Sequence, residues 1–265
     1  MRKMRNILLT GGTGQLGRML LNELEIQHLS VSVLTRGKAL ASNSGMKVIN
    51  ADLTDRSSLN SALNRNYDVV IHCASNPLES DTVDVKGTEN LLYAVGKGNV
   101  GNFIYISIVG VDKSTYRYYQ DKRRAEELVI SSGVPYTILR ITQFHDFVLN
   151  RILDAGKEND VITVPAGLKF QSIDLSDVSK KINQLIESGP CNSILQIGGP
   201  EILDADDIIR EYQTIVKPAK RIQFASTLND FQKLFTTGIN LCPDQKWGTV
   251  SWGDYLSSRR TDINM

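Results

Sequence analysis

The feature that most constrains the fold is a run of apolar residues and glycines near the start of the sequence. Residues 7–17 read Ile-Leu-Leu-Thr-Gly-Gly-Thr-Gly-Gln-Leu-Gly, and apolar residues at helical spacing follow at once. A strand that turns through closely spaced glycines into a helix lets the backbone approach a pyrophosphate. The start of that helix presents free N–H groups and the positive end of its dipole to the anion. Because a strand and a helix flank the glycines, the pattern predicts a dinucleotide-binding unit rather than an ordinary turn.

Strands and helices alternate along the first half of the chain. Helical periodicity between residues 83 and 95 predicts one of the intervening helices. Short apolar runs predict strands at residues 31–34, 47–49, 69–73, 103–106 and 136–139. This alternation is typical of a doubly wound parallel sheet with helices on both faces. We therefore expect an α/β fold of the Rossmann type.

The alternation loosens after Arg140. Asp204 is expected to cap a helix that runs to Val216. Short strands are expected at 161–164, 170–173 and 194–197, and a helix at 176–187. We interpret residues 1–150 as an NADP-binding Rossmann core, to whose sheet residues 190–200 add a strand. Residues 151–265 then form a small C-terminal α+β substrate lobe, packed with the core as one compact unit.

Composition argues against several classes of partner. The net charge is +1 and the basic runs are short, so we expect no nucleic-acid partner. The sequence contains no apolar run long enough to cross a bilayer, and the glycine motif begins so near Met1 that we expect little room for a targeting segment. Cys73, Cys191 and Cys242 are far apart, and no Cys/His cluster has metal-ligand spacing. A cytoplasmic protein with a small-molecule substrate, no membrane association and no metal is expected.

The end of the second expected strand indicates which dinucleotide is bound. NAD-binding proteins of this architecture usually place a carboxylate there, where it accepts a hydrogen bond from the ribose 2′-OH. This chain has Arg36 instead, and a guanidinium matches the 2′-phosphate of NADP. We therefore expect NADP(H) in preference to NAD, the alternative being that Arg36 is a solvated loop residue. Asp52 and Leu53 follow the third strand and are expected beside the adenine, although Asp52 could equally cap the next helix.

A second motif, Tyr118-x-x-x-Lys122, places a phenol and an ammonium on one face of a helix. The lysine charge favours the phenolate and would lower the pKa of Tyr118. Such a phenol can give its proton to a carbonyl oxygen while hydride arrives from NADPH. Ser107, at the end of the fifth strand, offers a hydroxyl that could orient the same carbonyl. Pairs at this spacing are often structural, and Tyr116 and Tyr119 compete for the role.

Two histidines are candidates for different roles. His145 follows the sixth strand closely and could bind substrate or relay protons, or it could equally be hydrogen-bonded to the structure. His72 lies within an apolar strand and is expected to be a satisfied core residue.

Over nearly its whole length the chain resembles the NmrA-like branch of the atypical short-chain dehydrogenase/reductase superfamily. The segments that carry the resemblance are 10–17, 87–92, 105–112, 118–122, 133–140, 142–147, 164–171 and the turn at 198–200. The resemblance implies an NADP(H)-binding Rossmann unit with a small C-terminal substrate lobe. It places Ser107, Tyr118 and Lys122 in the superfamily's catalytic positions. It also places the loop at 74–77 beside the nicotinamide ribose and the loop at 141–144 beside the nicotinamide.

Motif and resemblance together predict a set of cofactor-binding residues. These are Gly11, Thr13, Gly14, Gln15, Leu16, Gly17, Arg36, Asp52, Leu53, Ala74, Ser75, Asn76, Lys122, Ile141, Thr142 and Phe144. Ser107, Tyr118 and His145 are the residues expected to contact substrate.

The leading interpretation is an NADP(H)-dependent oxidoreductase that reduces a small carbonyl, quinone-like or unsaturated substrate, with Tyr118 as the general acid. Because some members of the branch bind the cofactor without turnover, one alternative is an NADP(H) sensor that recruits a protein partner. The helix signature Gly87-Thr88-x-Asn90 suggests another, a nucleotide-sugar epimerase or dehydratase. A third alternative is a structural or assembly protein that keeps the fold without the enzymatic activity. A homodimer is compatible with each.

Overall fold

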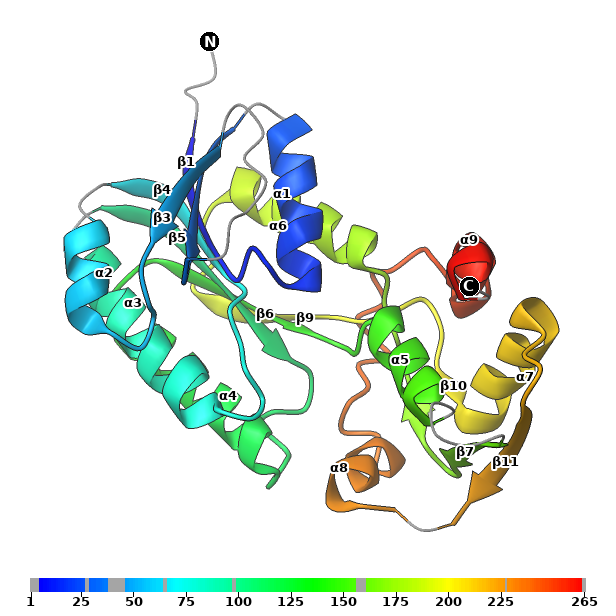
Figure 1. The fold of residues 1–265 in the computed structure, drawn as a ribbon. Helices are drawn as coiled ribbons and strands as arrows, with labels where there is room; N and C mark the ends of the chain where they lie inside the picture. Colours follow the sequence, from blue (N-terminus) through cyan, green and yellow to red (C-terminus); the bar gives the residue numbers. More distant parts are fainter. Residues whose placement is uncertain are drawn as a thin grey trace. The chain divides into compact units, whose positions relative to one another are not determined.

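The computed structural model describes residues 5–26, 29–37, 46–63, 66–96, 99–155, 161–226 and 228–263 (Figure 1). Its residues group into two units. The first comprises Met1–Ser107, Arg117–Arg140 and Ser179–Leu195, and the second comprises Ile108–Tyr116, Ile141–Val178 and Gln196–Met265. The chain thus passes between the units several times. The division into a core of residues 1–150 and a lobe of residues 151–265, packed as one compact unit, stays a prediction.

A seven-stranded sheet forms the first unit, in the order β3-β2-β1-β4-β5-β6-β9. Its strands are β1 (Asn6–Thr10), β2 (Ser30–Thr35), β3 (Met46–Asn50), β4 (Tyr67–His72), β5 (Val100–Ile108), β6 (Tyr136–Ile141) and β9 (Ser193–Ile197). β1 is central, and its Ile7 pairs in parallel with Val31 on one side and Val69 on the other. The order and direction of these strands confirm the predicted Rossmann-type α/β fold.

Helices cover both faces of this sheet (Figure 1). α1 (Gln15–Ile26) and α6 (Leu175–Ser188) lie on one face. α2 (Arg56–Ala62), α3 (Gly87–Gly96) and α4 (Arg117–Ser131) lie on the other. The core on the second face contains Leu8, Leu59, Val70, Leu91, Phe103, Val129 and Ile138, each completely buried. Each such aliphatic side chain stabilises the fold by about 1.5–3 kcal/mol on burial.

The helix expected at 83–95 begins differently from the prediction. Residues Asp81–Lys86 form a π-helical turn (η1), which leads directly into α3. A π turn holds one more residue than an α turn, so it changes the direction in which the side chains before α3 point. Asp84 lies within this turn and its side chain is fully buried.

The second unit combines helices with two small sheets. Its helices are α5 (His145–Ala155), α7 (Ala205–Val216), α8 (Asp230–Lys233) and α9 (Trp252–Ile263), with a 3-10 turn, η2, at Leu234–Thr236. β7 (Val161–Pro165) pairs in parallel with β11 (Arg221–Ala225), and β8 (Lys169–Phe170) pairs antiparallel with β10 (Leu203–Asp204). Asp204 caps α7 as predicted, because its carboxylate accepts the N–H of Asp207. Among the described residues, no helix is long and apolar enough to cross a membrane.

Candidate active site

The glycine loop between β1 and α1 has the geometry of a phosphate cradle. Gly11 has φ +73°, a conformation that favours glycine, and its backbone lies against that of Ala74: a Cβ on Gly11 would be 2.6 Å from the Ala74 nitrogen. The N–H of Gly14 donates to the carbonyl of Gly11 at 2.9 Å and closes the turn. Gly17, in the first turn of α1, packs so closely on Gly11 that a side chain there would collide with its carbonyl oxygen.

The start of α1 suits an anion. Its first turn has no acidic residue, and both Gly14 and Gln15 are exposed. The backbone N–H groups of a first helical turn have no partner within the helix and point toward the helix start. The residues of the loop therefore fit the pyrophosphate of a dinucleotide.

The residues expected around the adenosine end occupy the ends of β2 and β3. Arg36 is exposed directly after β2. Asp52 is half-buried, and its carboxylate accepts hydrogen bonds from the backbone and hydroxyl of Thr54 at 2.8 and 2.9 Å. The cap of α2 is Asp55, whose carboxylate accepts the N–H groups of Ser57 and Ser58. Asp52 therefore shapes the turn after β3 and leaves the capping role to Asp55.

The loop after β4 connects the glycine turn to Tyr118. Ala74 lies against Gly11, and the next residue, Ser75, has its hydroxyl 2.8 Å from the Tyr118 phenol oxygen. Tyr118 is half-exposed at the start of α4. The structure thus brings together the glycine loop, the 74–76 loop and the Tyr-x-x-x-Lys motif.

A buried carboxylate, Asp84, organises these groups. It accepts the Ser75 hydroxyl at 2.6 Å and the Asn76 N–H at 3.0 Å, and it pairs with the Lys122 ammonium at 3.5 Å. Ser75 has a single hydroxyl hydrogen, which it donates to Asp84. The Tyr118 phenol must therefore donate to Ser75, so the chain of donors runs from Tyr118 through Ser75 to Asp84.

Lys122 is buried next to Asp84, and its ammonium makes several contacts. Only 3% of its side chain is exposed, its Nζ donates to the Ile106 carbonyl at 2.7 Å, and it lies 4.3 Å from the centre of the Tyr105 ring. Burial lowers the pKa of Lys122, and the charge of Asp84 opposes part of that change. The ammonium is therefore paired with a carboxylate rather than directed at the phenol.

The expected effect of Lys122 on Tyr118 is wrong for this structure. The pKa of Tyr118 is raised well above its usual value, first because burial disfavours the phenolate and second because Asp84 is negatively charged. Once the phenol is ionised, Ser75 can turn its hydrogen to the phenolate, and this opposes the rise in the pKa of Tyr118 only in part. Tyr118 is therefore a phenol that keeps its proton at neutral pH.

The structure also corrects the role expected for Ser107. This hydroxyl is buried and donates to the Glu126 carboxylate at 2.6 Å. Glu126 also accepts two hydrogen bonds from the Arg140 guanidinium, at 2.8 and 2.7 Å. Ser107 thus belongs to a buried ion-pair network between β5, α4 and β6, and its hydrogen is not available to a substrate.

His72 is a satisfied core residue, as expected. Burial lowers its pKa to about 3, so the ring is neutral and carries one N–H. The Thr88 hydroxyl donates to the Asp84 carbonyl, so it must accept from His72 Nε2, 2.9 Å away. His72 Nδ1 then accepts the Thr10 hydroxyl at 2.6 Å, and Thr10 in turn accepts the Ala74 N–H. This chain of hydrogen bonds ties the residue before the glycine turn to the π-helical turn that carries Asp84.

The residues expected at the nicotinamide edge belong to the second unit. Ile141 is buried, Phe144 is half-buried, and the Thr142 hydroxyl donates to the Gln171 carbonyl. His145 is completely buried, with Nε2 donating to the Val250 carbonyl at 3.1 Å and Nδ1 accepting from a hydroxyl, that of Ser172, at 2.8 Å. Both of its ring nitrogens are used within the fold, so the structural alternative for His145 is the correct one.

Asp84 is the important residue that the motifs missed. One signal was present: a carboxylate between Val83 and Val85, inside a segment whose apolar residues predicted a buried helix. An acidic residue at a buried position requires a partner. Its partner, Lys122, is 38 residues away in the sequence and is brought to it by the packing of η1 against α4.

Similarity to known proteins is consistent with this geometry. The family model described as NAD(P)H-binding matches residues 11–188. The mitochondrial 40 kDa subunit of NADH-ubiquinone oxidoreductase from Neurospora crassa is 25% identical over 215 residues, 75% of this chain. The chloroplastic divinyl chlorophyllide a 8-vinyl-reductase of Arabidopsis thaliana is 24% identical over 222 residues, 74% of this chain. The chain spans 56% and 53% of the lengths of these two relatives.

The fold also matches solved structures. NADPH-dependent quinone oxidoreductase QOR2 from Escherichia coli, in complex with NADPH, has a TM-score of 0.79 and 19% identity, with 98% of this chain and 100% of that chain covered. At this identity the likeness concerns the fold. The family match spans the glycine loop, Asp84, Tyr118 and Lys122. The chain belongs to the NAD(P)H-binding family, within the NmrA-like branch of atypical short-chain dehydrogenase/reductase proteins.

Proposed function

We propose that the protein is an NADP(H)-dependent oxidoreductase that reduces a small carbonyl, quinone-like or unsaturated substrate, with Tyr118 as the general acid. The observation that carries the proposal is the chain of hydrogen bonds from Tyr118 through Ser75 to Asp84, which starts beside the glycine loop. A general acid must be protonated before reaction and must lie near the cofactor site. Tyr118 fits both requirements.

The residues of the first unit divide the work of binding and proton transfer. The glycine loop and the start of α1 would hold the pyrophosphate, and the exposed Arg36 would hold a 2′-phosphate. The bound dinucleotide supplies the hydride. Tyr118 turns its hydroxyl from Ser75 toward the substrate oxygen and donates its proton there. Ser75 can then turn its own hydrogen toward the phenolate, while Lys122 balances the charge of Asp84.

The names of similar proteins support a reductase. The relative from Arabidopsis thaliana is a vinyl-reductase and QOR2 is an NADPH-dependent quinone oxidoreductase. Both names describe reduction of an unsaturated carbon or quinone. This supports the substrate classes proposed here without choosing between them.

The test compares wild type with Tyr118→Phe, which keeps the ring and removes the acidic proton. NADPH oxidation is followed by absorbance over a panel of quinones, aldehydes, ketones and enones, and NADPH binding is measured by calorimetry. We expect turnover to fall by roughly 10²- to 10⁴-fold while the affinity for NADPH stays unchanged.

Tyr93→Phe is the matched control, because Tyr93 lies on α3 with 48% of its surface exposed and outside the site. It should leave turnover intact. Full activity in Tyr118→Phe would overturn the assignment of the acid. Tight NADPH binding with no turnover on any compound would favour the sensor alternative instead.

A further inference from the structure

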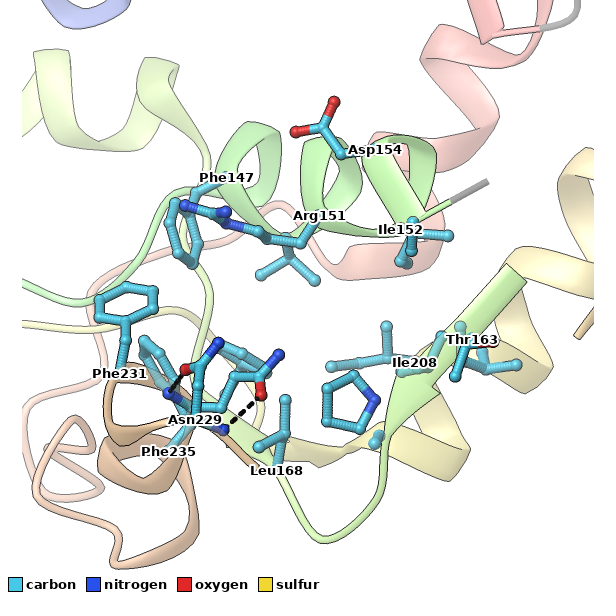
Figure 2. A pocket seen from close by; sticks show the side chains of 18 residues that line it. Phe147, Arg151, Ile152, Asp154, Thr163, Leu168, Ile208, Asn229, Phe231 and Phe235 are labelled. Atoms are coloured by element: carbon cyan, nitrogen blue, oxygen red, sulfur yellow. Dashed lines mark hydrogen bonds between the residues drawn. The ribbon is translucent and has the colours of Figure 1, made fainter. Parts of the chain in front are cut away.

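We propose that a cavity within the second unit binds a flat aromatic ligand that carries a carboxylate. The cavity has a volume of about 260 Å³ and lies between α5, β7, α7 and the segment that contains α8 (Figure 2). Its apolar lining includes Val148, Ile152, Leu168, Phe170, Ile208 and Phe235. A concave, mostly apolar site with a few polar groups is typical of small-molecule binding. The second unit forms this site alone, so the inference does not depend on the proposed reductase activity.

Aromatic rings form one wall of the cavity. Phe231 lies 5.2 Å from Phe235 and 6.2 Å from Phe147 between ring centres, with interplanar angles of 83° and 77°. Phe170 lies 4.7 Å from Phe235. Figure 2 shows the rings of Phe147, Phe231 and Phe235 gathered at one side of the cavity. Such a wall offers both ring edges and ring faces, which are the contacts that a planar aromatic ligand prefers.

A cation lies against this wall. The Arg151 guanidinium is 5.1 Å from the centre of the Phe147 ring and 5.6 Å from that of Phe231. A guanidinium that stacks on a ring keeps its in-plane N–H donors for an anion. Within the described residues no carboxylate forms an ion pair with Arg151, and the Asp154 carboxylate points away from the cavity in Figure 2.

Two side-chain amides in the cavity lining add further hydrogen-bond donors for an anionic ligand. Asn229 and Gln232 line the cavity and form a capping box at the start of α8, in which each side-chain oxygen accepts the other residue's backbone N–H. Their oxygens are thus occupied, while their NH₂ groups remain donors. Arginine and amide donors beside stacked rings match an aromatic acid, in which a carboxylate and a planar ring are joined.

Cinnamate and its neutral amide, cinnamamide, are suitable probes because they differ mainly in charge. We expect the full-length protein, measured by calorimetry without NADPH, to bind cinnamate at least roughly tenfold more tightly than cinnamamide. Arg151→Met keeps an apolar stem over the rings and should abolish this preference. Arg210→Met removes an exposed arginine from α7 outside the lining and should leave it intact.

A second variant locates the ligand. Ala155 is half-buried in the lining at the end of α5, and Ala155→Trp should fill part of the cavity and weaken binding of both probes. Thermal unfolding of each variant checks that it remains folded. Equal affinity for the two probes, an unchanged preference in Arg151→Met, or unchanged binding in Ala155→Trp would each overturn the proposal, as would no binding of either probe. Loss of NADPH turnover alone would bear only on the proposed function.

Discussion

Among single residues, Asp84 has the largest influence on the chemistry of the candidate site. Asp84 and Lys122 are both buried, so each is costly to hold in the interior without the other. Asp84 also accepts the Ser75 hydroxyl, and its charge helps to raise the pKa of Tyr118. A motif-based mechanism with Lys122 as the group that tunes Tyr118 omits this carboxylate. Asp84 is a positioning residue, since it acts on the phenol through Ser75 and through its charge.

Asp84→Asn should move the alkaline limit of activity to lower pH. A general acid works only while protonated, so a raised pKa of Tyr118 extends activity upward in pH, and loss of the Asp84 charge removes part of that rise. Because burial is the larger cause, the limit should stay above that of an ordinary tyrosine. The measurement is the pH dependence of kcat/KM.

Asp81→Asn is the control for this experiment. Asp81 lies in the same π-helical turn, but its carboxylate pairs with Lys86 and Arg124 at the surface. Its removal should leave the pH profile unchanged. If Asp84→Asn also has the wild-type profile while it remains folded, the charge of Asp84 has no part in tuning Tyr118. We also expect Asp84→Asn to lower the free energy of unfolding by about 3 kcal/mol, because Lys122 is left buried without its partner.

Ser107 and His145 show that a sequence does not reveal whether a side chain's hydrogen-bonding groups are free or already used within the fold. A hydroxyl at the end of β5 looks available until Glu126, on a different element, takes its hydrogen. His145 likewise follows the loop at 141–144 that was expected beside the nicotinamide, but its two ring nitrogens are hydrogen-bonded to Ser172 and Val250. In each case the deciding partner is distant along the chain. Motifs record which groups are present, whereas tertiary packing decides which of them remain free.

At the scale of elements, the strands and helices of the first unit were predictable because each strand is covered by helices on both faces of the sheet. The predicted strand at 31–34 is β2 (Ser30–Thr35), and the one at 136–139 is β6 (Tyr136–Ile141). Both are buried along nearly their whole length, because helices cover both faces of a parallel sheet. The π-helical turn was not predictable, since one additional residue in a single turn hardly alters the periodicity of a short helix.

The join between β1 and α1 can be tested through Gly17. A methyl group in Gly17→Ala would meet the Gly11 carbonyl and lie 2.7 Å from the Gly12 Cα, so the loop must shift. NADPH affinity should fall by roughly tenfold or more, since the loop backbone would no longer fit the pyrophosphate. Calorimetric titration with NADPH measures this change.

Gly96→Ala provides the matched comparison. Gly96 is at the end of α3, and the nearest atom to a new Cβ there would be a methyl of Val134 at 3.9 Å. This variant should bind NADPH like wild type and gain up to about 1 kcal/mol of stability, because alanine favours helix. Equal NADPH affinity in the two variants would mean that close packing of Gly17 on Gly11 is not needed for binding.

At the scale of the whole molecule, the sequence order of the parts differs from their grouping in space. β9 (Ser193–Ile197) joins the sheet beside β6, although the second-unit segment Ile141–Val178 lies between the two strands in the sequence. The sequence analysis expected this return, because it assigned residues 190–200 to an additional strand of the core sheet, and β9 is that strand. It did not predict which strand β9 would pair with, since the neighbour of a strand depends on contacts between distant segments.

Cofactor preference can be read from the stability of the whole chain. A ligand that binds only the folded state raises the free energy of unfolding in proportion to the logarithm of its concentration relative to its Kd. If Arg36 binds a 2′-phosphate, NADPH should raise the melting temperature more than NADH at equal concentration. Arg36→Gln should abolish the difference, because a charge-assisted contact contributes about 1.5–3 kcal/mol, or roughly a tenfold to hundredfold change in affinity.

The control for this comparison is Arg221→Gln, at an exposed position on β11 in the second unit, which should keep the preference for NADPH. Wild type and both variants are melted with each dinucleotide over a range of concentrations, so that the concentration dependence gives Kd. Equal stabilisation of the wild type by NADPH and NADH would contradict the proposed role of Arg36 as the residue that selects NADP(H). A preference that persists in Arg36→Gln would mean that another group recognises the 2′-phosphate, and the exposed end of β2 would lose its place in the cofactor site.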